Sequence, residues 1–271
     1  MRYLIDHDLH IHSVGSMCSG VPEQTPDRIL QYAADEGFAT VGLSDHFWDE
    51  TVPMPQGGWG PDFYTSQNYA HICQNLPLPC RSGIRFLFGA EVDMTLDGTV
   101  GVSPQRLAAL DYVLISISHF HCTDFTIRSE DAATPEGRAA VLLDKLEALL
   151  EMPLPWYKIG LAHLTGPKLG GGDPDNHCEV LRLVQGERLT ALFRKAAALG
   201  VGVELNTATF VFGNEAERQA VTAFYAHAKE CGCRFFFGSD AHCPAHFVPH
   251  RQRAQAMADS LGLTDADIFR I

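Results

Sequence analysis

The most constraining feature of this chain is a series of short apolar segments, most of which end in histidine or acidic residues. Seven such segments have the composition of buried parallel strands. Their expected bounds are 3–12, 40–46, 85–94, 112–120, 158–164, 201–207 and 234–239. Six of the seven end in a histidine, a carboxylate or both. Because burying such groups without partners costs several kcal/mol, their recurrence predicts that the strand ends converge on something that binds them.

Amphipathic segments with recognisable helix starts lie between these strands. Three of them begin with a hydroxyl residue before a proline, the usual N-cap and first helical residue. These starts are Thr25-Pro26, Ser103-Pro104 and Thr134-Pro135. The expected helices are 26–36, 66–75, 104–110, 135–151, 178–199, 215–231 and 250–261. The sequence therefore alternates strand and helix from one end to the other, which predicts an α/β fold with a parallel sheet.

Seven strand–helix units favour a closed or nearly closed TIM-like barrel, formed as one domain over residues 1–271. The alternative is an open, doubly wound sheet, which would focus its site at one switch point. Polar residues at nearly every strand end favour the barrel, because its rim gathers all of these ends. Two long loops, 48–65 and 165–176, lie on the same rim. Each is expected to be either a substrate wall or an ordinary surface loop.

Composition narrows the class of protein. The formal charge of −13 disfavours broad binding to nucleic acid. No apolar run approaches the length of a membrane helix, and the N-terminus meets an acidic residue too early for a secretory signal. The eight cysteines are scattered without a Cys-x-x-Cys pair, so they are expected to be reduced. Together these observations predict a cytoplasmic protein.

The polar strand ends have the composition of a metal site. His10 and His12 are two residues apart on a strand, so both side chains face the same side. Asp8 lies on that side too and is expected to orient one of them. Asp240 and His242 repeat the spacing at the last strand. Any one histidine here is most simply a hydrogen-bonded rim residue, but their recurrence favours divalent transition metals, which imidazole and carboxylate bind well.

These motifs, taken in order, resemble those of the polymerase and histidinol phosphatase (PHP) superfamily. Asp8-Leu9-His10-Ile11-His12 resembles the first motif and Gly238-Ser239-Asp240-Ala241-His242 the last. The intervening motifs are Ser44-Asp45-His46, Gly89-Ala90-Glu91, Ser118-His119 and Ala162-His163. The resemblance spans residues 6–242 and is to a stand-alone, histidinol-phosphatase-like member. It implies a distorted seven-stranded (β/α)7 barrel.

The resemblance also implies two or three divalent metal ions, zinc, manganese or iron. One ion would be held by His10, His12, Glu91 and Asp240. A second would be bridged by Glu91 and held by His119 and His163, and a third would be held by His46 and His242. Members with three metals have another histidine shortly after the first motif. Here Cys18 lies near that position, as either a thiolate ligand or a loop residue.

The expected reaction is metal-dependent hydrolysis of a small phosphomonoester such as histidinol phosphate. Two ions can share a hydroxide that attacks phosphorus, and the sequence contains neither a nucleophile elbow nor a Walker loop. Glu91 and Asp240 would act as ligands at the reacting centre, and His121 as a proton donor or substrate contact. Arg128 and Lys168 are the preferred phosphate-binding residues, ahead of Arg251 and Arg253.

Three other functions remain open at this point. The first is a nucleotide or oligonucleotide phosphoesterase of the exonuclease type, which the negative charge disfavours for long substrates. The second is a metal-dependent amidohydrolase acting on a C–N bond, although no lysine stands at a strand end to bridge the metals. The third is a metal store or binding module without turnover. For the preferred reaction, phosphomonoester hydrolysis, the expected partner is a small phosphorylated substrate, and no membrane partner is expected.

Overall fold

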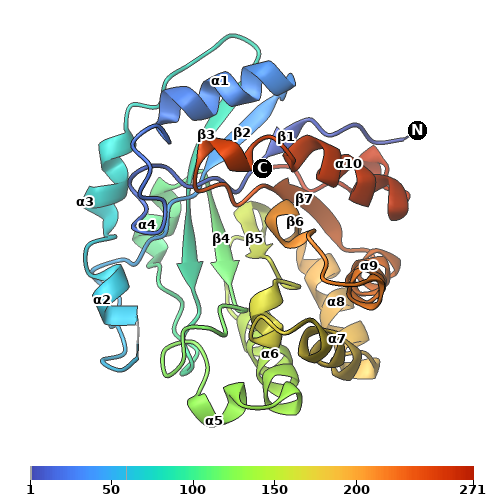
Figure 1. The fold of residues 1–271 in the computed structure, drawn as a ribbon. Helices are drawn as coiled ribbons and strands as arrows, with labels where there is room; N and C mark the ends of the chain where they lie inside the picture. Colours follow the sequence, from blue (N-terminus) through green and yellow to red (C-terminus); the bar gives the residue numbers. More distant parts are fainter. Residues whose placement is uncertain (1, 59) are drawn as a thin grey trace.

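The computed structural model describes residues 2–58 and 60–271, and within them seven parallel strands form one sheet in sequential order (Figure 1). The strands are β1 (His7–Asp8), β2 (Thr40–Leu43), β3 (Arg85–Asp93), β4 (Tyr112–Ser116), β5 (Ile159–Ala162), β6 (Gly202–Asn206) and β7 (Arg234–Gly238). Each of the seven predicted strand segments therefore contains a strand. The predicted TIM-like (β/α)7 barrel is confirmed.

Backbone hydrogen bonds bring the first strand segment against the last. The Leu9 amide donates to the Phe237 carbonyl at 2.9 Å, and the His12 amide donates to the Ala241 carbonyl at 3.0 Å. Between them, the Asp240 amide donates to the His10 carbonyl at 2.7 Å. An open doubly wound sheet would leave these two segments apart, so the open-sheet alternative is wrong. Closure also places the motif around His10 directly beside the motif around Asp240.

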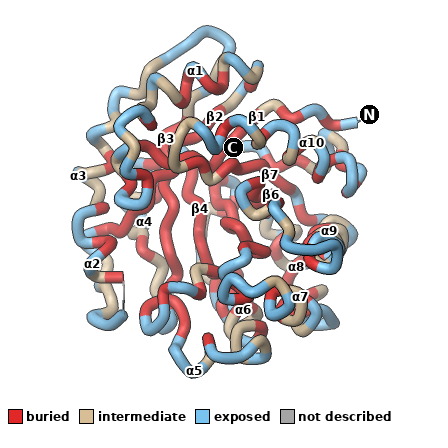
Figure 2. The backbone as a smooth tube through the Cα atoms, viewed as in Figure 1, coloured by how far each residue is buried: buried red, intermediate tan, exposed pale blue. Residues whose placement is uncertain are grey.

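Helices surround the barrel and bury the outer faces of its strands (Figures 1 and 2). They are α1 (Pro26–Glu36), α2 (Gly60–Tyr64), α3 (Tyr69–Ile72), α4 (Pro104–Ala109), α5 (Ser129–Ala132), α6 (Pro135–Leu150), α7 (Pro174–Leu183), α8 (Glu187–Leu199), α9 (Glu215–Glu230) and α10 (His250–Ser260). The predicted N-caps are confirmed, because the side chains of Thr25, Ser103 and Thr134 each accept an amide hydrogen bond. None of the helices in the described residues is long and apolar enough to span a membrane.

One predicted helix, 178–199, is wrong. The chain forms two helices there, α7 and α8, and α7 begins four residues earlier than expected. The Asp173 carboxylate accepts hydrogen bonds from the amides of Asp175 and Asn176, which starts α7 at Pro174. Gly186 then adopts φ 137°, a conformation that no helix contains and that glycine tolerates best. Apolar residues recur at helical spacing on both sides of Gly186 because α7 and α8 both pack on the barrel.

The loop predicted over 48–65 contains the short helix α2, and Trp59 of that loop lies outside the described residues. The strands also end earlier than expected, before most of the polar residues of their motifs. His163 and Asp240 follow strands β5 and β7 and have positive φ values of 30° and 54°. These backbone turns carry the two side chains out of the sheet ladder and toward the barrel axis.

Tyr112 fills the barrel interior beneath the polar strand ends. Its hydroxyl donates to the Leu9 carbonyl at 2.7 Å, and its ring occupies the space left by two glycines on neighbouring strands. A Cβ atom at Gly42 would lie 2.2 Å from the Tyr112 hydroxyl oxygen, and one at Gly89 would lie 2.4 Å from a ring carbon. Glycine is therefore required at both positions by the space that this ring fills.

This packing predicts that Gly89→Ala destabilises the protein. The added methyl group meets a fully buried ring inside a closed barrel, where overpacking costs about 1–3 kcal/mol. The free energy of unfolding from denaturant titration measures the effect. Gly57→Ala is the matched control, because a Cβ atom there would come no nearer than 3.7 Å to its closest neighbour. Equal stability of the two variants would contradict the packing argument.

Candidate metal centre

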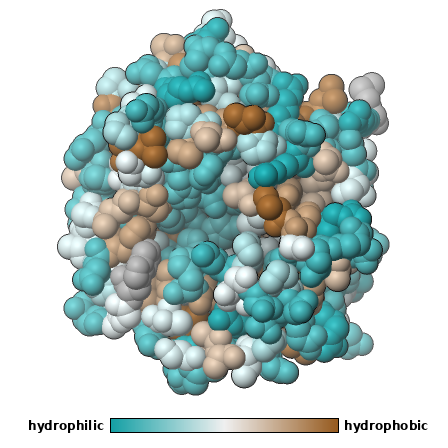
Figure 3. Space-filling model, in the orientation of Figure 1, coloured by the Kyte–Doolittle hydropathy of each residue, from teal (hydrophilic) through white to brown (hydrophobic). Residues whose placement is uncertain are grey.

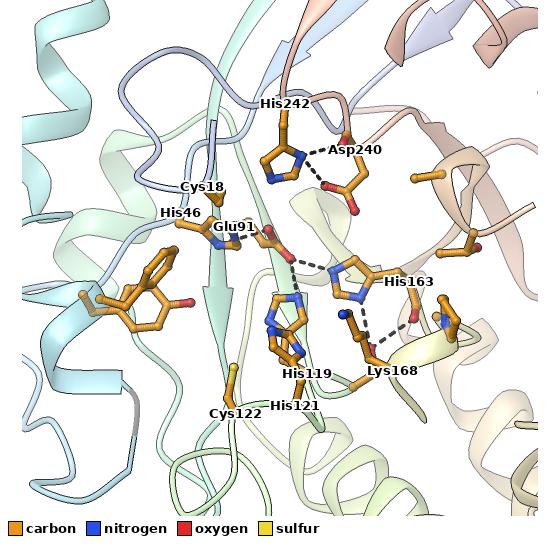
Figure 4. A pocket seen from close by; sticks show the side chains of 17 residues that line it. Cys18, His46, Glu91, His119, His121, Cys122, His163, Lys168, Asp240 and His242 are labelled. Atoms are coloured by element: carbon orange, nitrogen blue, oxygen red, sulfur yellow. Dashed lines mark hydrogen bonds and ion pairs between the residues drawn. The ribbon is translucent and has the colours of Figure 1, made fainter. Parts of the chain in front are cut away.

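Glu91, in strand β3, lies at the centre of the polar cluster and is almost completely buried (Figure 4). Its two carboxylate oxygens face different histidines. Oε1 lies 2.7 Å from His163 Nε2 and 3.6 Å from His119 Nε2. Oε2 faces three further nitrogens, His10 Nε2 at 3.3 Å, His12 Nε2 at 3.4 Å and His46 Nδ1 at 3.2 Å. One carboxylate therefore divides five imidazoles into two groups.

Carboxylates behind the cluster determine which ring nitrogen of two histidines carries the proton. His10 Nδ1 lies 2.8 Å from Glu204 Oε1, and His119 Nδ1 lies 2.8 Å from Asp93 Oδ1. An ionised carboxylate only accepts hydrogen bonds, so Nδ1 is the donor in both rings. The Nε2 lone pair of each ring consequently points into the cluster, as a metal ligand requires.

Three other histidines are oriented in the same way by oxygen atoms. The Ser16 hydroxyl donates to Asp45 and accepts from His12 Nδ1 at 3.1 Å. The Ser118 hydroxyl donates to the backbone carbonyl of His163 and accepts from that residue's Nδ1 at 3.0 Å. His242 Nδ1 donates to the Asp240 carbonyl at 2.8 Å. In all three rings Nε2 is left as the free acceptor.

This arrangement fits a bound cation. The Nε2 atoms of His10 and His12 lie 3.2 Å apart, and Asp240 Oδ1 lies 3.2 Å from His12 Nε2. Two lone pairs and two carboxylates that face one another in a buried space repel unless a positive charge lies between them. Imidazole nitrogen and carboxylate oxygen are the donors that zinc and related divalent ions accept. The donor set therefore matches the metals expected from the sequence.

The pKa shifts point to the same need for positive charge. Burial lowers the pKa of His10, but the carboxylates of Glu204, Asp240 and Glu91 outweigh burial and raise it well above its ordinary value. Burial raises the pKa values of Glu91 and Asp240, yet the surrounding histidines hold both well below their usual range. Both acids are thus ionised at neutral pH. A divalent ion would replace the proton that the surrounding carboxylates otherwise stabilise on His10.

The structure brings the predicted metal ligands together in three overlapping groups. Within each group the candidate donor atoms all lie within 4.8 Å of one another. The groups are His10, His12 and Asp240; His10, Glu91 and His163; and His12, Cys18, His46 and His242. His119 belongs to none of these groups and reaches the cluster through Glu91 Oε1. The predicted residues therefore share one site, although their metal-binding roles stay predictions.

Two acids behind the ligands were missed by the sequence analysis. Glu204, in the middle of β6, accepts from His10 Nδ1 through Oε1 and from the His163 amide through Oε2, at 2.6 Å. Asp93 supports His119, and its Oδ2 also accepts from the Tyr64 hydroxyl at 2.7 Å. A signal existed for Glu204, because it is the one acid on its strand, whereas Asp93 shares its strand with Glu91. Such an acid requires a partner inside the barrel.

The role predicted for Asp8 is wrong. We expected this residue to orient His10 or His12 through a ring nitrogen. Instead its carboxylate accepts from the backbone amides of His10 and Ser239 and from the Tyr32 hydroxyl. Asp8 thus joins the first strand to the last one and to α1. The expected orienting function belongs to Glu204.

A pocket of about 340 Å³ opens beside the cluster. Glu91, His119, His163, Asp240 and His242 lie along its polar side. Apolar residues from several loops form much of the rest, namely Phe63, Tyr64, Cys122, Pro167 and Ala208. Both long rim loops contribute to this lining, so they are walls of the pocket. The face shown in Figure 3 is hollowed near its centre, and hydrophilic side chains line the hollow.

The predicted substrate residues differ in position. Lys168 and His121 line the pocket, and the Lys168 backbone is held by a hydrogen bond from Arg138. Burial, together with His119 and Lys168, lowers the pKa of His121 to about 4, so this ring is neutral at pH 7. That favours a substrate contact over a proton donor. Arg128 is exposed before α5 and is not among the pocket-lining residues.

Other basic candidates are engaged elsewhere. The guanidinium groups of Arg251 and Arg253 donate to the backbone carbonyls of Glu36 and Thr207. His177 and His250 are also buried, and both support the fold. His177 Nδ1 bonds Glu217 Oε1 at 2.7 Å, and His250 Nδ1 bonds the Thr207 hydroxyl at 2.8 Å.

The position of Glu204 predicts that Glu204→Gln weakens metal binding. A glutamine side chain accepts through only one of its two terminal atoms, so it leaves either His10 Nδ1–H or the His163 amide opposed by an N–H group. Loss of such a partner lowers metal affinity by roughly 10- to 100-fold. Elemental analysis after dialysis against a weak chelator measures retained zinc.

Glu217→Gln is the matched control for this experiment. Glu217 is also a buried acid that accepts from a histidine Nδ1, but its partner His177 lies outside the cluster. This variant should keep its zinc even if the folded state is less stable. Equal zinc loss from both variants would mean that Glu204 acts only through stability.

Comparisons with known proteins support the fold. No family model matches the sequence, and no curated protein sequence matches it significantly. Among solved structures, histidinol phosphate phosphatase from Lactococcus lactis has a TM-score of 0.60 at 16% identity, covering 97% of this chain and 95% of that one. That protein was solved in complex with zinc, L-histidinol and phosphate. A putative histidinol phosphatase from Listeria monocytogenes has a TM-score of 0.57 at 17% identity, covering 89% and 96%.

Proposed function

We propose that this protein is a metal-dependent phosphoesterase that hydrolyses a small phosphomonoester. The observation that carries the proposal is the division of the histidines by Glu91. One oxygen faces His10, His12 and His46, and the other faces His119 and His163. Two adjacent divalent ions are the occupants that such a divided donor set suits best. The likeness in fold to the two histidinol phosphatases supports the same function.

The residues have distinct tasks in this proposal. His10, His12 and Asp240 would hold one ion, His119 and His163 would hold the second, and Glu91 would contribute to both. Bound ions would supply Lewis acidity toward the phosphoryl oxygens and lower the pKa of water to give a nucleophile. Glu204 and Asp93 keep the imidazoles at fixed angles, so no reorientation is needed when the substrate arrives.

The remaining pocket residues receive the substrate. Lys168 lines the pocket and supplies a positive charge for a phosphate oxygen. Phe63 and Tyr64, both buried on α2, present aromatic surface to the leaving alcohol. A volume of about 340 Å³ suits a small phosphorylated molecule and leaves little room for a polymer. Histidinol phosphate is therefore the first substrate to test.

A phosphate-release screen with the metal-reconstituted protein tests this function. Histidinol phosphate, sugar phosphates, nucleotides and short oligonucleotides are compared after loading with zinc, manganese or iron. We expect release from small monoesters to exceed release from oligonucleotides. Cyclic amides are tested in parallel by mass spectrometry, and their hydrolysis in place of every phosphate ester would favour an amidohydrolase. Metal binding without any turnover would favour a metal store.

Glu91→Gln is expected to reduce turnover by about 100-fold or more, because a neutral amide cannot bridge two cations. The steady-state rate of phosphate release and the number of ions retained per chain are both measured. We expect the retained ions to fall together with the rate. Full turnover by this variant would refute the bridging role.

Lys168→Ala and Arg128→Ala separate the two predicted phosphate-binding residues. Loss of a charge-assisted contact in the pocket should raise KM for the phosphorylated substrate by roughly 10- to 150-fold, or about 1.5–3 kcal/mol. Because Lys168 lines the pocket and Arg128 does not, the larger effect is expected at Lys168. A larger effect at Arg128 would reverse the assignment. Inorganic phosphate inhibition provides a second measurement of the same contact.

A further inference from the structure

The pocket beside the metal centre has an aromatic wall next to one of the candidate ligands. Phe63 lines the pocket, and its ring centroid lies 5.1 Å from that of His46, with an angle of 77° between the two rings. Tyr64 lines the pocket as well, and its ring centroid lies 5.0 Å from that of Phe63. Cys122 belongs to the same buried apolar cluster as both rings. A substrate bound at the metal centre therefore meets an apolar surface on the His46 side.

Each hydroxyl group in the described pocket lining already donates to a protein oxygen. The Tyr64 hydroxyl donates to Asp93 Oδ2 at 2.7 Å, so its ring is the part that faces a substrate. The Ser118 hydroxyl donates to the His163 carbonyl at 3.1 Å. The Thr209 hydroxyl donates to a backbone carbonyl at 2.7 Å. None of these groups carries a negative charge, so none is a counter-ion for a cationic substrate.

The carboxylates of the pocket lining are both part of the metal centre. Among the described residues they are Glu91, which faces five imidazoles, and Asp240, whose Oδ1 lies 3.2 Å from His12 Nε2. Cations bound there would take up the negative charge of both acids. Outside the centre, the lining carries the positive charge of Lys168, on the His163 side of Glu91 (Figure 4). The described part of the pocket therefore offers no separate carboxylate to an ammonium group on the substrate.

We propose that the pocket selects phosphomonoesters whose alcohol portion is uncharged and aromatic over those whose alcohol portion carries an ammonium group. Lys168 and the metal centre receive the phosphoryl group, and Phe63 and Tyr64 receive the aromatic group. An ammonium group in this pocket loses water without gaining a carboxylate partner, which is unfavourable. The positive charge of Lys168 adds repulsion. This inference deepens the proposed function, because it names the class of phosphomonoester, and it rests on that function.

Two pairs of esters that differ only in the amine test this selectivity. Histidinol phosphate is compared with imidazolylpropyl phosphate, and phenylalaninol phosphate with phenylpropyl phosphate. Phosphate release by the metal-loaded protein gives kcat/KM for each ester. We expect the ester without the amine to be preferred by about tenfold or more in both pairs, because the shared skeleton makes the same contacts. Equal values, or a preference for the amine, would overturn the inference and leave phosphoester hydrolysis standing.

Phe63→Glu places a carboxylate in the aromatic wall and should change the preference. The ratio of the two kcat/KM values within each pair should fall toward one or reverse, because the amine gains a counter-ion. Tyr157→Glu is the matched control, since Tyr157 is an aromatic residue that is 70% exposed and is not among the pocket-lining residues. This control should keep the wild-type ratio. An unchanged ratio in a folded, active Phe63→Glu variant contradicts the position assigned to the aromatic group.

Phosphonate analogues separate the selectivity of the pocket from turnover. Phenylbutylphosphonate carries a methylene group in place of the ester oxygen of phenylpropyl phosphate, so it binds without being hydrolysed. Calorimetry with the wild-type protein should give it an affinity about tenfold or more above that of its amino derivative. This order of affinities in a protein that releases no phosphate would reject the proposed function and keep the selectivity. Equal affinities for the two phosphonates would reject the selectivity, whatever the rate of phosphate release.

Discussion

The buried carboxylate of Glu91 is the constraint on which the rest of the site depends. A negative charge at this depth is tolerated only among positive or hydrogen-bonding partners, and five imidazoles from four different strand ends supply them. The imidazoles in turn are fixed by a second set of acids, of which Glu204 is the clearest example. Each layer of charge therefore requires the next, and bound cations would complete the balance.

The barrel explains how residues so far apart in the sequence share one pocket. Parallel strands place all their carboxyl ends on one rim, and sequential strand order sets each motif beside the next one in the chain. The Tyr112 ring fills the barrel interior beneath the polar rim, so no open channel lies below the cluster at this position. The backbone turns at His163 and Asp240 then direct two ligands inward. The pocket wall comes from the loops, which carry residues such as Phe63 and Lys168.

Much of this arrangement could be predicted from the sequence, because continuous apolar runs and polar strand ends are local signals. The seven strands and the convergence of His10, Glu91 and Asp240 depend only on such signals. The orienting acids could not be assigned in the same way. Which acid faces His10 depends on the register between strands, and Glu204 reaches it across the barrel from β6. The break at Gly186 was hidden by apolar spacing that two successive helices share.

Closure of the ring by backbone bonds between the segments at Leu9 and Phe237 has a consequence for biosynthesis. A nascent chain exposes His10 long before Asp240 is translated, so an emerging fragment holds half of a chelate whose other half does not yet exist. Contacts between such distant positions form slowly. Ion binding by the group of His10, His12 and Asp240 would therefore depend on completion of the last strand.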